Sequence, residues 1–273
     1  MILKEGGNVF KDRDGNILTQ DIDQTDIKPT IIWLEELTGL PLQDNLLGST
    51  GLKPQSGDID VGVDKTQTPK SKLYAILSTW CQSHGLNPDD NISGGKSKDT
   101  AVDKAEQMSF KCPITGRSDR GYVQVDFMFE PDIEWARFAK RADPNTVYPD
   151  TAKHIVLNSV GKNTVSDEYP NGFTWSGQYG LLDRGTGQLV SKDPAEIAKL
   201  LFGAKGKPDD LRSVEKVLAA SRRQKQADAI YQQMQGDIEN ANKGSLKHKP
   251  VTLPELKEND SPGWYRTMMG RLA

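Results

Sequence analysis

The segment 58–64, which reads DIDVGVD, constrains the fold of this 273-residue chain more than any other segment. Acidic and apolar residues alternate along it. This alternation is typical of a β-strand, because successive side chains of a strand point to opposite faces. Asp58 and Asp60 then share one face, and Ile59 and Val61 enter a core on the other. The sequence therefore predicts a strand that presents two neighbouring carboxylates.

Two carboxylates this close repel each other, and burying them without a partner is costly. A divalent cation removes the conflict, and magnesium accepts two such carboxylates together with water and phosphate oxygens. Gly48 and Ser49 lie a short loop upstream. Glycine lets the backbone approach an anion closely, and the serine N–H and hydroxyl can bind phosphate oxygens. Cation-binding and phosphate-binding groups in adjacent elements indicate a nucleoside triphosphate that binds with its metal ion.

The first half of the chain predicts strands mixed with helices. Apolar spacing predicts helices at 29–40, 70–83, 133–141 and 151–160, and strands at 44–49, 58–64, 107–114 and 122–129. Residues 12–15 predict the turn of a small N-terminal hairpin, and the polar residues 87–99 predict a loop.

The second half of the chain is expected to be mostly helical. The sequence predicts a hairpin at 173–190 with its turn near 185–187, followed by helices at 194–202 and 208–240. The whole pattern predicts an α+β fold. A catalytic domain with an N-terminal hairpin arm is expected at 1–149, and a mostly helical C-terminal lobe with a tail at 150–273.

The spacing of the acidic pair resembles a known family signature. Gly48-Ser49, eight residues and then Asp58-x-Asp60 resemble the signature of the DNA polymerase β-like nucleotidyltransferase superfamily. Members of that superfamily have a helix, a strand that ends in Gly-Ser, a strand with Asp-x-Asp and a third carboxylate on a later strand. The resemblance implies a polymerase β-like nucleotidyltransferase core, in which the helix at 29–40 precedes the Gly-Ser strand.

The third carboxylate of the signature matches Asp126, which lies in the apolar strand YVQVDFMF. Glu130 is the fallback, although its place beside Pro131 at the strand end predicts an exposed side chain. The resemblance covers roughly residues 29–130. The chain as a whole resembles uncharacterised phage-encoded members of the superfamily.

The resemblance implies that a nucleoside monophosphate moves from a triphosphate to an acceptor hydroxyl and that pyrophosphate is released. Asp58 and Asp60 would bind two metal ions, Mg²⁺ or Mn²⁺. Asp126 would complete the site of the ion that activates the hydroxyl. Gly48 and Ser49 would hold the triphosphate, and ATP is the expected substrate.

RNA is the favoured acceptor, because the superfamily often acts on RNA and the second half carries basic clusters at 221–225 and 247–249. A net charge of −3 argues against indiscriminate nucleic-acid binding. A protein or small-molecule hydroxyl is an alternative acceptor. A non-catalytic module of the same fold, which binds a nucleotide or a nucleic acid, is the alternative from another functional class.

Composition narrows the type of metal site and the location of the protein. The cysteines, Cys81 and Cys112, have no ligand-like spacing, and the histidines are scattered at His84, His154 and His248. Carboxylates would therefore have to hold any metal ion. No apolar run approaches the ~20 residues of a membrane span, and the first residues predict no signal peptide. We therefore expect a cytoplasmic protein with reduced thiols and no membrane contact.

Three further segments are weaker candidates for function. Residues 94–98 (GGKSK) resemble a phosphate loop but lack its spacing, so an exposed loop is expected. Lys153 and His154 lie on the helix after the core, where relatives often place nucleotide contacts, but a packed or solvated helix is the favoured explanation. Apolar residues at helical spacing in 264–272 predict a terminal helix that docks on the protein's own core, with partner binding as the alternative.

Overall fold

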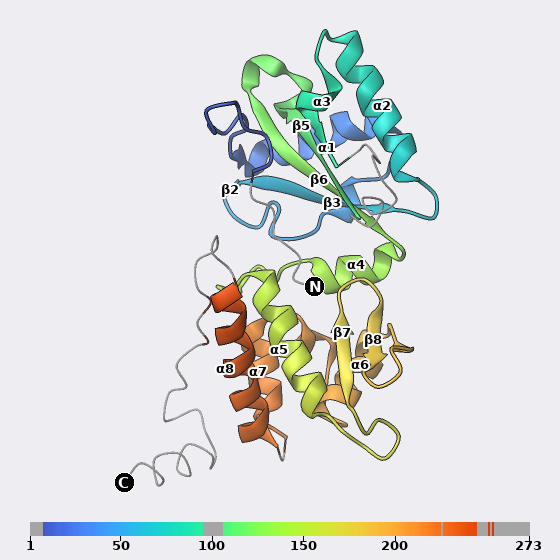
Figure 1. The fold of residues 1–273 in the computed structure, drawn as a ribbon, viewed down its shortest axis with the longest axis vertical. Helices are drawn as coiled ribbons and strands as arrows, with labels where there is room; N and C mark the ends of the chain where they lie inside the picture. The colour runs from blue at the N-terminus through green and yellow to red at the C-terminus, as the bar shows by residue number, and fades with distance from the viewer. Residues whose placement is uncertain (1–7, 95–105, 225, 245–250, 252, 254–273) are drawn as a thin grey trace. The chain divides into compact units, whose positions relative to one another are not determined.

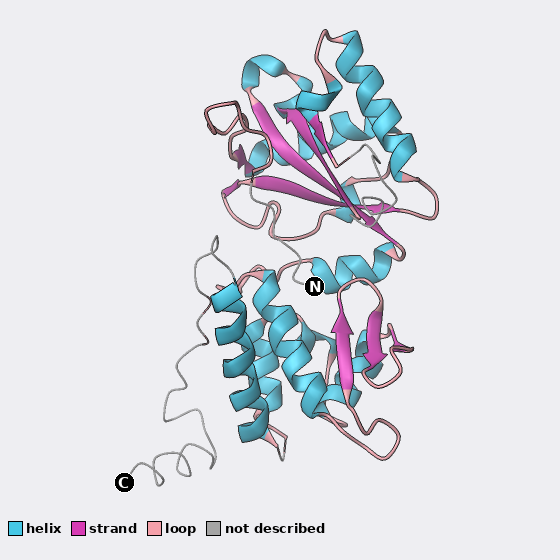
Figure 2. Ribbon diagram, in the orientation of Figure 1, coloured by secondary structure: helices cyan, strands magenta, loops and turns pink. Residues whose placement is uncertain are grey.

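The computed structural model describes residues 8–94, 106–224, 226–244, 251 and 253. The chain forms two compact units, Met1–Pro144 and Asn145–Ala273. The sequence predicts this boundary near Pro149, a few residues further along the chain. Figures 1 and 2 show helices and strands intermixed in the first unit, and the predicted α+β class is confirmed.

A mixed four-stranded sheet is the centre of the first unit. Its order is β3 (Asp58–Asp64), β6 (Tyr122–Glu130), β5 (Gln107–Pro113) and β4 (Ile92–Ser93). The two strands of the acidic face, β3 and β6, run parallel, and β5 is antiparallel to both of its neighbours. The predicted strands at 58–64, 107–114 and 122–129 are confirmed to within a residue at each end.

One face of this sheet is the core of the unit. Ile59 and Val61 of β3 are fully buried, as are Val125 and Phe127 of β6. They pack with apolar residues of α1 (Gln24–Thr38) and α2 (Lys70–Ser83). The alternation of β3 thus sends its aliphatic side chains to the core, as predicted, and Asp58 and Asp60 to the opposite face.

Helix α1 starts earlier than the sequence predicts. The helix begins after Asp23 and contains Pro29, which was expected to be its first residue. The Pro29 ring removes only one backbone donor near the helix start, and packing of Ile27 and Ile31 in the core outweighs that loss. The helix ends at Thr38, two residues before the predicted end, because the Gly39 backbone is left-handed and its N–H donates to Glu35 O.

The predicted strand at 44–49 is wrong. The segment instead contains the 3₁₀ helix η1 (Gln43–Asn45), followed by single bridges from Leu46 to Val61 and from Gly48 to Arg141. A second difference lies in the expected loop at 87–99, where α3 (Pro88–Asn91) and β4 form. The Asn87 side chain caps α3 by accepting the Asp89 N–H. Short strands β1 (Ile22–Asp23) and β2 (Gln55–Ser56) pair separately, and α4 (Ile133–Lys140) follows the sheet as predicted.

The second unit combines helices with a small antiparallel sheet. Its first helix is α5 (Asp150–Asn163), and α6 (Pro194–Phe202) has the predicted bounds. The expected hairpin at 173–190 is a three-stranded sheet of β7 (Phe173–Ser176), β8 (Gly180–Asp183) and β9 (Leu189–Ser191). The predicted turn near 185–187 joins β8 to β9, and a second turn at 177–179 accounts for the additional strand.

The single helix predicted over 208–240 is also wrong. The segment contains η5 (Pro208–Leu211), α7 (Val214–Ser221) and α8 (Ala227–Gly244). Ser213 starts α7 because its hydroxyl accepts the Lys216 N–H at 3.3 Å. After α7, the Gln224 N–H donates to Ser221 O at 3.0 Å, and the Gln224 side chain donates to Leu201 O. The buried apolar residues of 214–238 therefore lie on two helices, α7 and α8.

Several predicted features lie outside the described residues: 95–99 of the expected loop, Lys225, 247–249 and 264–272. No helix in the described part of the chain has the length and apolar character that crossing a membrane requires.

Candidate functional site

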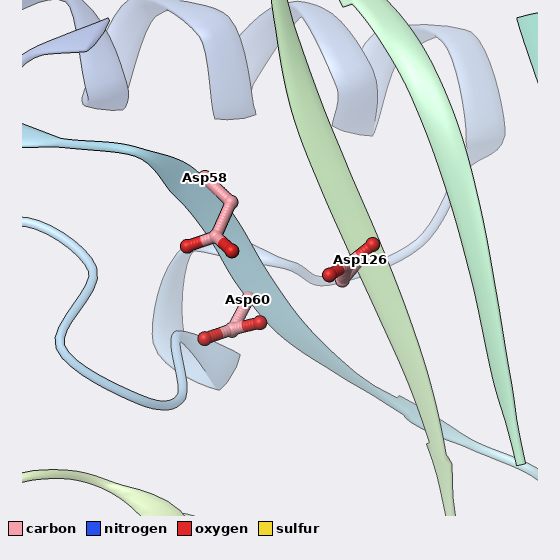
Figure 3. A group of neighbouring side chains, drawn as sticks. All are labelled: Asp58, Asp60 and Asp126. Atoms are coloured by element: carbon pink, nitrogen blue, oxygen red, sulfur yellow. The ribbon is translucent and has the colours of Figure 1, made fainter. Parts of the chain in front are cut away.

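Three carboxylates meet on the face of the sheet opposite the core. The parallel register of β3 and β6 places Asp60 beside Asp126 and Asp58 beside Gln124. One carboxylate oxygen from each of Asp58, Asp60 and Asp126 lies within 4.8 Å of the other two. Figure 3 shows all three side chains on one side of the two strands. The two strands thus bring together the three acids that the sequence singled out.

The electrostatics of this cluster favour a bound cation. Asp126 is only 1% exposed, and Asp58 and Asp60 are half-buried. Two negative charges at this separation repel by about 3–4 kcal/mol at an effective dielectric constant near 20. A hard divalent cation that prefers oxygen ligands offsets this repulsion. The donor set therefore fits Mg²⁺ or Mn²⁺, and the burial of Asp126 distinguishes the cluster from ordinary surface acids.

Gly48 lies directly against one of the three acids. Its backbone is left-handed, with a φ of 53°, and a Cβ atom there would lie 2.2 Å from Asp60 Oδ2. Its N–H donates to Lys140 O at 3.0 Å, and its carbonyl accepts from Ala142 N at 2.9 Å. The Gly48 N–H is therefore occupied, and the space left by the absent side chain is filled by the Asp60 carboxylate. The sequence did not predict this use of the glycine.

The two residues after Gly48 have different roles. Ser49 is exposed, and within the part of the chain that the structure describes its N–H and hydroxyl donate to no protein acceptor. Both groups are thus available to an anion beside the carboxylates. Thr50 is 1% exposed, and its hydroxyl accepts the Asp60 N–H at 2.9 Å. Thr50 anchors β3 at Asp60 and was missed by the sequence reasoning, because a threonine in a loop carries no distinguishing signal.

The segment after α4 holds residues 47–50, here called the glycine loop, in place. Arg141 Nη1 donates to Leu47 O at 3.0 Å and to Gly48 O at 3.3 Å. Together with the two backbone bonds of Gly48, these contacts fix the loop along residues 140–142. Charge-assisted donation to two adjacent carbonyls is stronger than a neutral bond. The loop beside the carboxylates is thus held from a segment more than ninety residues further along the chain.

Glu130 is not part of the cluster, and its predicted exposure is wrong. It is 1% exposed at the end of β6 and forms an ion pair with Lys140, the last residue of α4. Burial raises the pKa of the Glu130 carboxyl above its usual value, although the charge of Lys140 and its hydrogen bond oppose this effect. Pro131 ends the strand but does not bring the Glu130 side chain into solvent.

Lys153 and His154 belong to a hydrogen-bonded network within the second unit. Lys153 Nζ lies 2.6 Å from Asp150 Oδ1, and His154 Nε2 lies 3.0 Å from Asp150 Oδ2. Trp175 Nε1 donates to His154 Nδ1 at 2.8 Å, so Nδ1 is the acceptor nitrogen of that ring. Burial raises the pKa of Asp150, but the bond from His154 and the charge of Lys153 outweigh it, and the pKa lies below its usual value. The packed-helix interpretation accounts for both residues.

The basic cluster at 221–225 is partly neutralised. Arg223 Nη2 forms an ion pair with Asp210 Oδ2 at 2.8 Å. Arg222 caps the end of α7 through its backbone N–H, which donates to Leu218 O at 3.1 Å. The charge available to a nucleic acid at this place is smaller than the sequence suggests.

The fold and the site together define an α+β protein with three clustered carboxylates on one face of a mixed sheet, beside a glycine loop. No protein-family model, curated protein or solved structure matches the chain.

Proposed function

We propose that this protein is a divalent-metal-dependent nucleotidyltransferase with a polymerase β-like core. The observation that carries the proposal is the convergence of Asp58, Asp60 and Asp126, whose oxygens lie within 4.8 Å of one another. The exposed Ser49 beside them supplies free donors for phosphate oxygens. A metal site and phosphate donors side by side support a nucleoside triphosphate as substrate, and we propose ATP.

The donor set supports Mg²⁺ or Mn²⁺ as the cofactor. Asp58 and Asp60 would hold the cation that accompanies the triphosphate, and Asp126 would complete the site on the acceptor side. When bound, the metal ions lower the pKa of the acceptor hydroxyl and neutralise the leaving pyrophosphate.

The residues of the chain orient this transfer. The acceptor oxygen forms a bond to the α-phosphorus, and the bond from that phosphorus to the oxygen bridging to the β-phosphate breaks. Pyrophosphate leaves with that oxygen, and the acceptor proton goes to solvent or to Asp126. Ser49 donates to the triphosphate, while Gly48 and Thr50 keep the Asp60 carboxylate and its backbone in place. Catalysis then rests on positioning and charge stabilisation, as is usual for phosphoryl transfer.

We propose RNA as the acceptor class on the basis of the basic residues of the second unit. The ion pair between Arg223 and Asp210 reduces this support. Labelling of RNA, of protein and of small molecules with radioactive nucleotide would identify the acceptor.

Pyrophosphate release tests the proposal directly. Wild-type protein with each of the four ribonucleoside triphosphates and Mg²⁺ is expected to release pyrophosphate in the presence of acceptor. Asp58→Asn keeps the size of the side chain and removes its charge, so release should fall by about 100-fold or more at unchanged circular dichroism. Triphosphate binding without pyrophosphate release, over all candidate acceptors, would instead support the non-catalytic binding module.

A further inference from the structure

Gln124 lies next to the three clustered carboxylates, on the same pair of strands. In the register of β3 and β6 it lies beside Asp58, as Asp126 lies beside Asp60. Gln124 and Asp126 are two residues apart on one strand and so share a face. The Gln124 residue is 1% exposed, which is rare for glutamine unless its amide is bonded. This face of the sheet thus combines three acids with one neutral amide.

The Gln124 amide connects Asp126 to the N-terminal arm. Its Nε2 donates to Asp126 Oδ1 at 3.2 Å and to Oδ2 at 3.0 Å. Its Oε1 accepts the Val9 N–H at 2.9 Å. A backbone N–H can only donate and a carboxylate accepts, so these two partners determine which end of the amide faces which way.

The arm that carries Val9 is itself anchored to the sheet. Leu18 N donates to Phe10 O at 2.9 Å, and Gln20 N donates to Tyr122 O at 2.8 Å, at the start of β6. Phe10 is only 5% exposed. The Val9 N–H therefore has a fixed place relative to β6, and it can hold the Gln124 amide in one orientation.

We propose that Gln124 is a positioning residue that sets the orientation of the Asp126 carboxylate toward the metal site, and that Val9 of the N-terminal arm holds Gln124. The inference rests on the proposed function, because Asp126 is assigned there to the metal ion on the acceptor side. One amide nitrogen bonds both Asp126 oxygens and so restricts rotation of the carboxylate. Replacing a residue that orients a metal ligand in this way commonly lowers metal affinity or activity by about 10- to 100-fold.

The main test replaces the amide by a side chain of similar length without a donor, Gln124→Met. Calorimetric titration of the full-length protein with Mn²⁺ is expected to show about tenfold weaker binding. The turnover number should fall about tenfold as well. The KM for ATP should stay unchanged, because Asp58 and Asp60 hold the ion of the triphosphate. The matched control is Gln55→Met, since the Gln55 amide also donates to an aspartate, Asp23 Oδ1 at 3.0 Å, which is not one of the three clustered acids. Gln55→Met should leave the Mn²⁺ affinity and the turnover number unchanged.

A second pair of variants tests the arm and leaves the Gln124 residue itself unsubstituted. Val9→Pro removes the N–H, and Val9→Ala keeps it. Mn²⁺ binding should weaken in the proline variant alone, by about threefold, because the amide then loses one of its two anchors. If Gln124→Met fails to fold, this pair decides the question, and equal Mn²⁺ affinity in both Val9 variants would overturn the inference.

The outcomes separate this inference from the proposed function. Wild-type Mn²⁺ binding that is equally tight in Gln124→Met would overturn the positioning role and leave the metal site intact. Stability lost without any change in Mn²⁺ affinity would also overturn it, since that result describes a purely structural glutamine. Absence of Mn²⁺ binding by the wild-type protein would contradict the proposed function and this inference with it.

Discussion

The close contact between Gly48 and Asp60 links the glycine loop to the acidic strand at the level of single atoms. Any side chain at Gly48 would meet the Asp60 carboxylate, because a Cβ would lie 2.2 Å from Oδ2. Glycine is thus required there twice, for its left-handed backbone and for the space it leaves. The sequence motif is explained by the placement of Asp60, a metal ligand in the proposed function, as much as by the proposed access of a phosphate.

Gly48→Ala is expected to damage the site more than the fold. The left-handed backbone costs alanine about 1–2 kcal/mol of unfolding free energy. The displaced Asp60 carboxylate should further reduce metal-dependent turnover at least tenfold. Gly39→Ala is a matched control, because Gly39 has a φ of 71° but no atom within 4 Å of a Cβ. Urea denaturation and pyrophosphate release on both variants make the comparison, and equal activity in the two would contradict the role given to Gly48.

At the residue scale, the three acids could be predicted from the sequence, but the residues that hold them in place by hydrogen bonds could not. Asp126 was recognisable because an acid inside an apolar strand needs a partner. Gln124 carried the same signal, a polar residue on the same strand face, but its Val9 partner lies more than a hundred positions away. Thr50 accepts a backbone N–H of β3, and Arg141 donates to backbone carbonyls of the glycine loop. No pattern in a single sequence identifies such contacts.

At the level of elements, periodic apolar patterns gave reliable predictions. The helix at 70–83 and the strand at 58–64 have the predicted bounds, because core packing follows their apolar periodicity directly. The predictions failed where one or two hydrogen bonds decide the structure. Single bridges replace the expected strand at 44–49, and the Ser213 cap divides the helix expected at 208–240. Single hydrogen bonds of this kind produce no periodic pattern of apolar residues from which they could be predicted.

Glu130 is buried at the end of β6 beside Lys140 at the end of α4, and its titration should make stability depend on pH. Burial raises the pKa of Glu130 in the folded protein, so the folded state binds its proton more tightly than the unfolded state. The contribution of this group to stability is therefore present at low pH. It is lost as the pH rises from the usual glutamate pKa through the raised one.

Glu130→Gln removes this titration and isolates its effect. The unfolding free energy of the variant minus that of the wild type should increase as the pH rises from 4 to 8, since all other groups titrate in both proteins. Urea denaturation across that range measures the difference. A difference that falls with rising pH would mean that Lys140 outweighs burial and lowers the Glu130 pKa in the folded state.

At the scale of the whole molecule, the described chemistry is concentrated in the first unit. The three carboxylates, the glycine loop and the segment that holds it all lie within Met1–Pro144. In the second unit, the polar side chains that the sequence singled out form internal networks, as Lys153 and His154 do with Asp150. The α+β class and the acidic site could thus be predicted from the sequence. The acceptor of the proposed reaction could not, because its recognition would depend on surface geometry that has no local signature.

Anomalous diffraction from crystals of the full-length protein grown with Mn²⁺ and a non-hydrolysable ATP analogue is the most direct test of the metal-dependent site. We predict manganese peaks within about 2.2 Å of carboxylate oxygens of Asp58, Asp60 and Asp126. The triphosphate should lie between those peaks and the Ser49 donors. A bound nucleotide with no manganese at the three carboxylates, or with manganese at other residues, would contradict the proposed function.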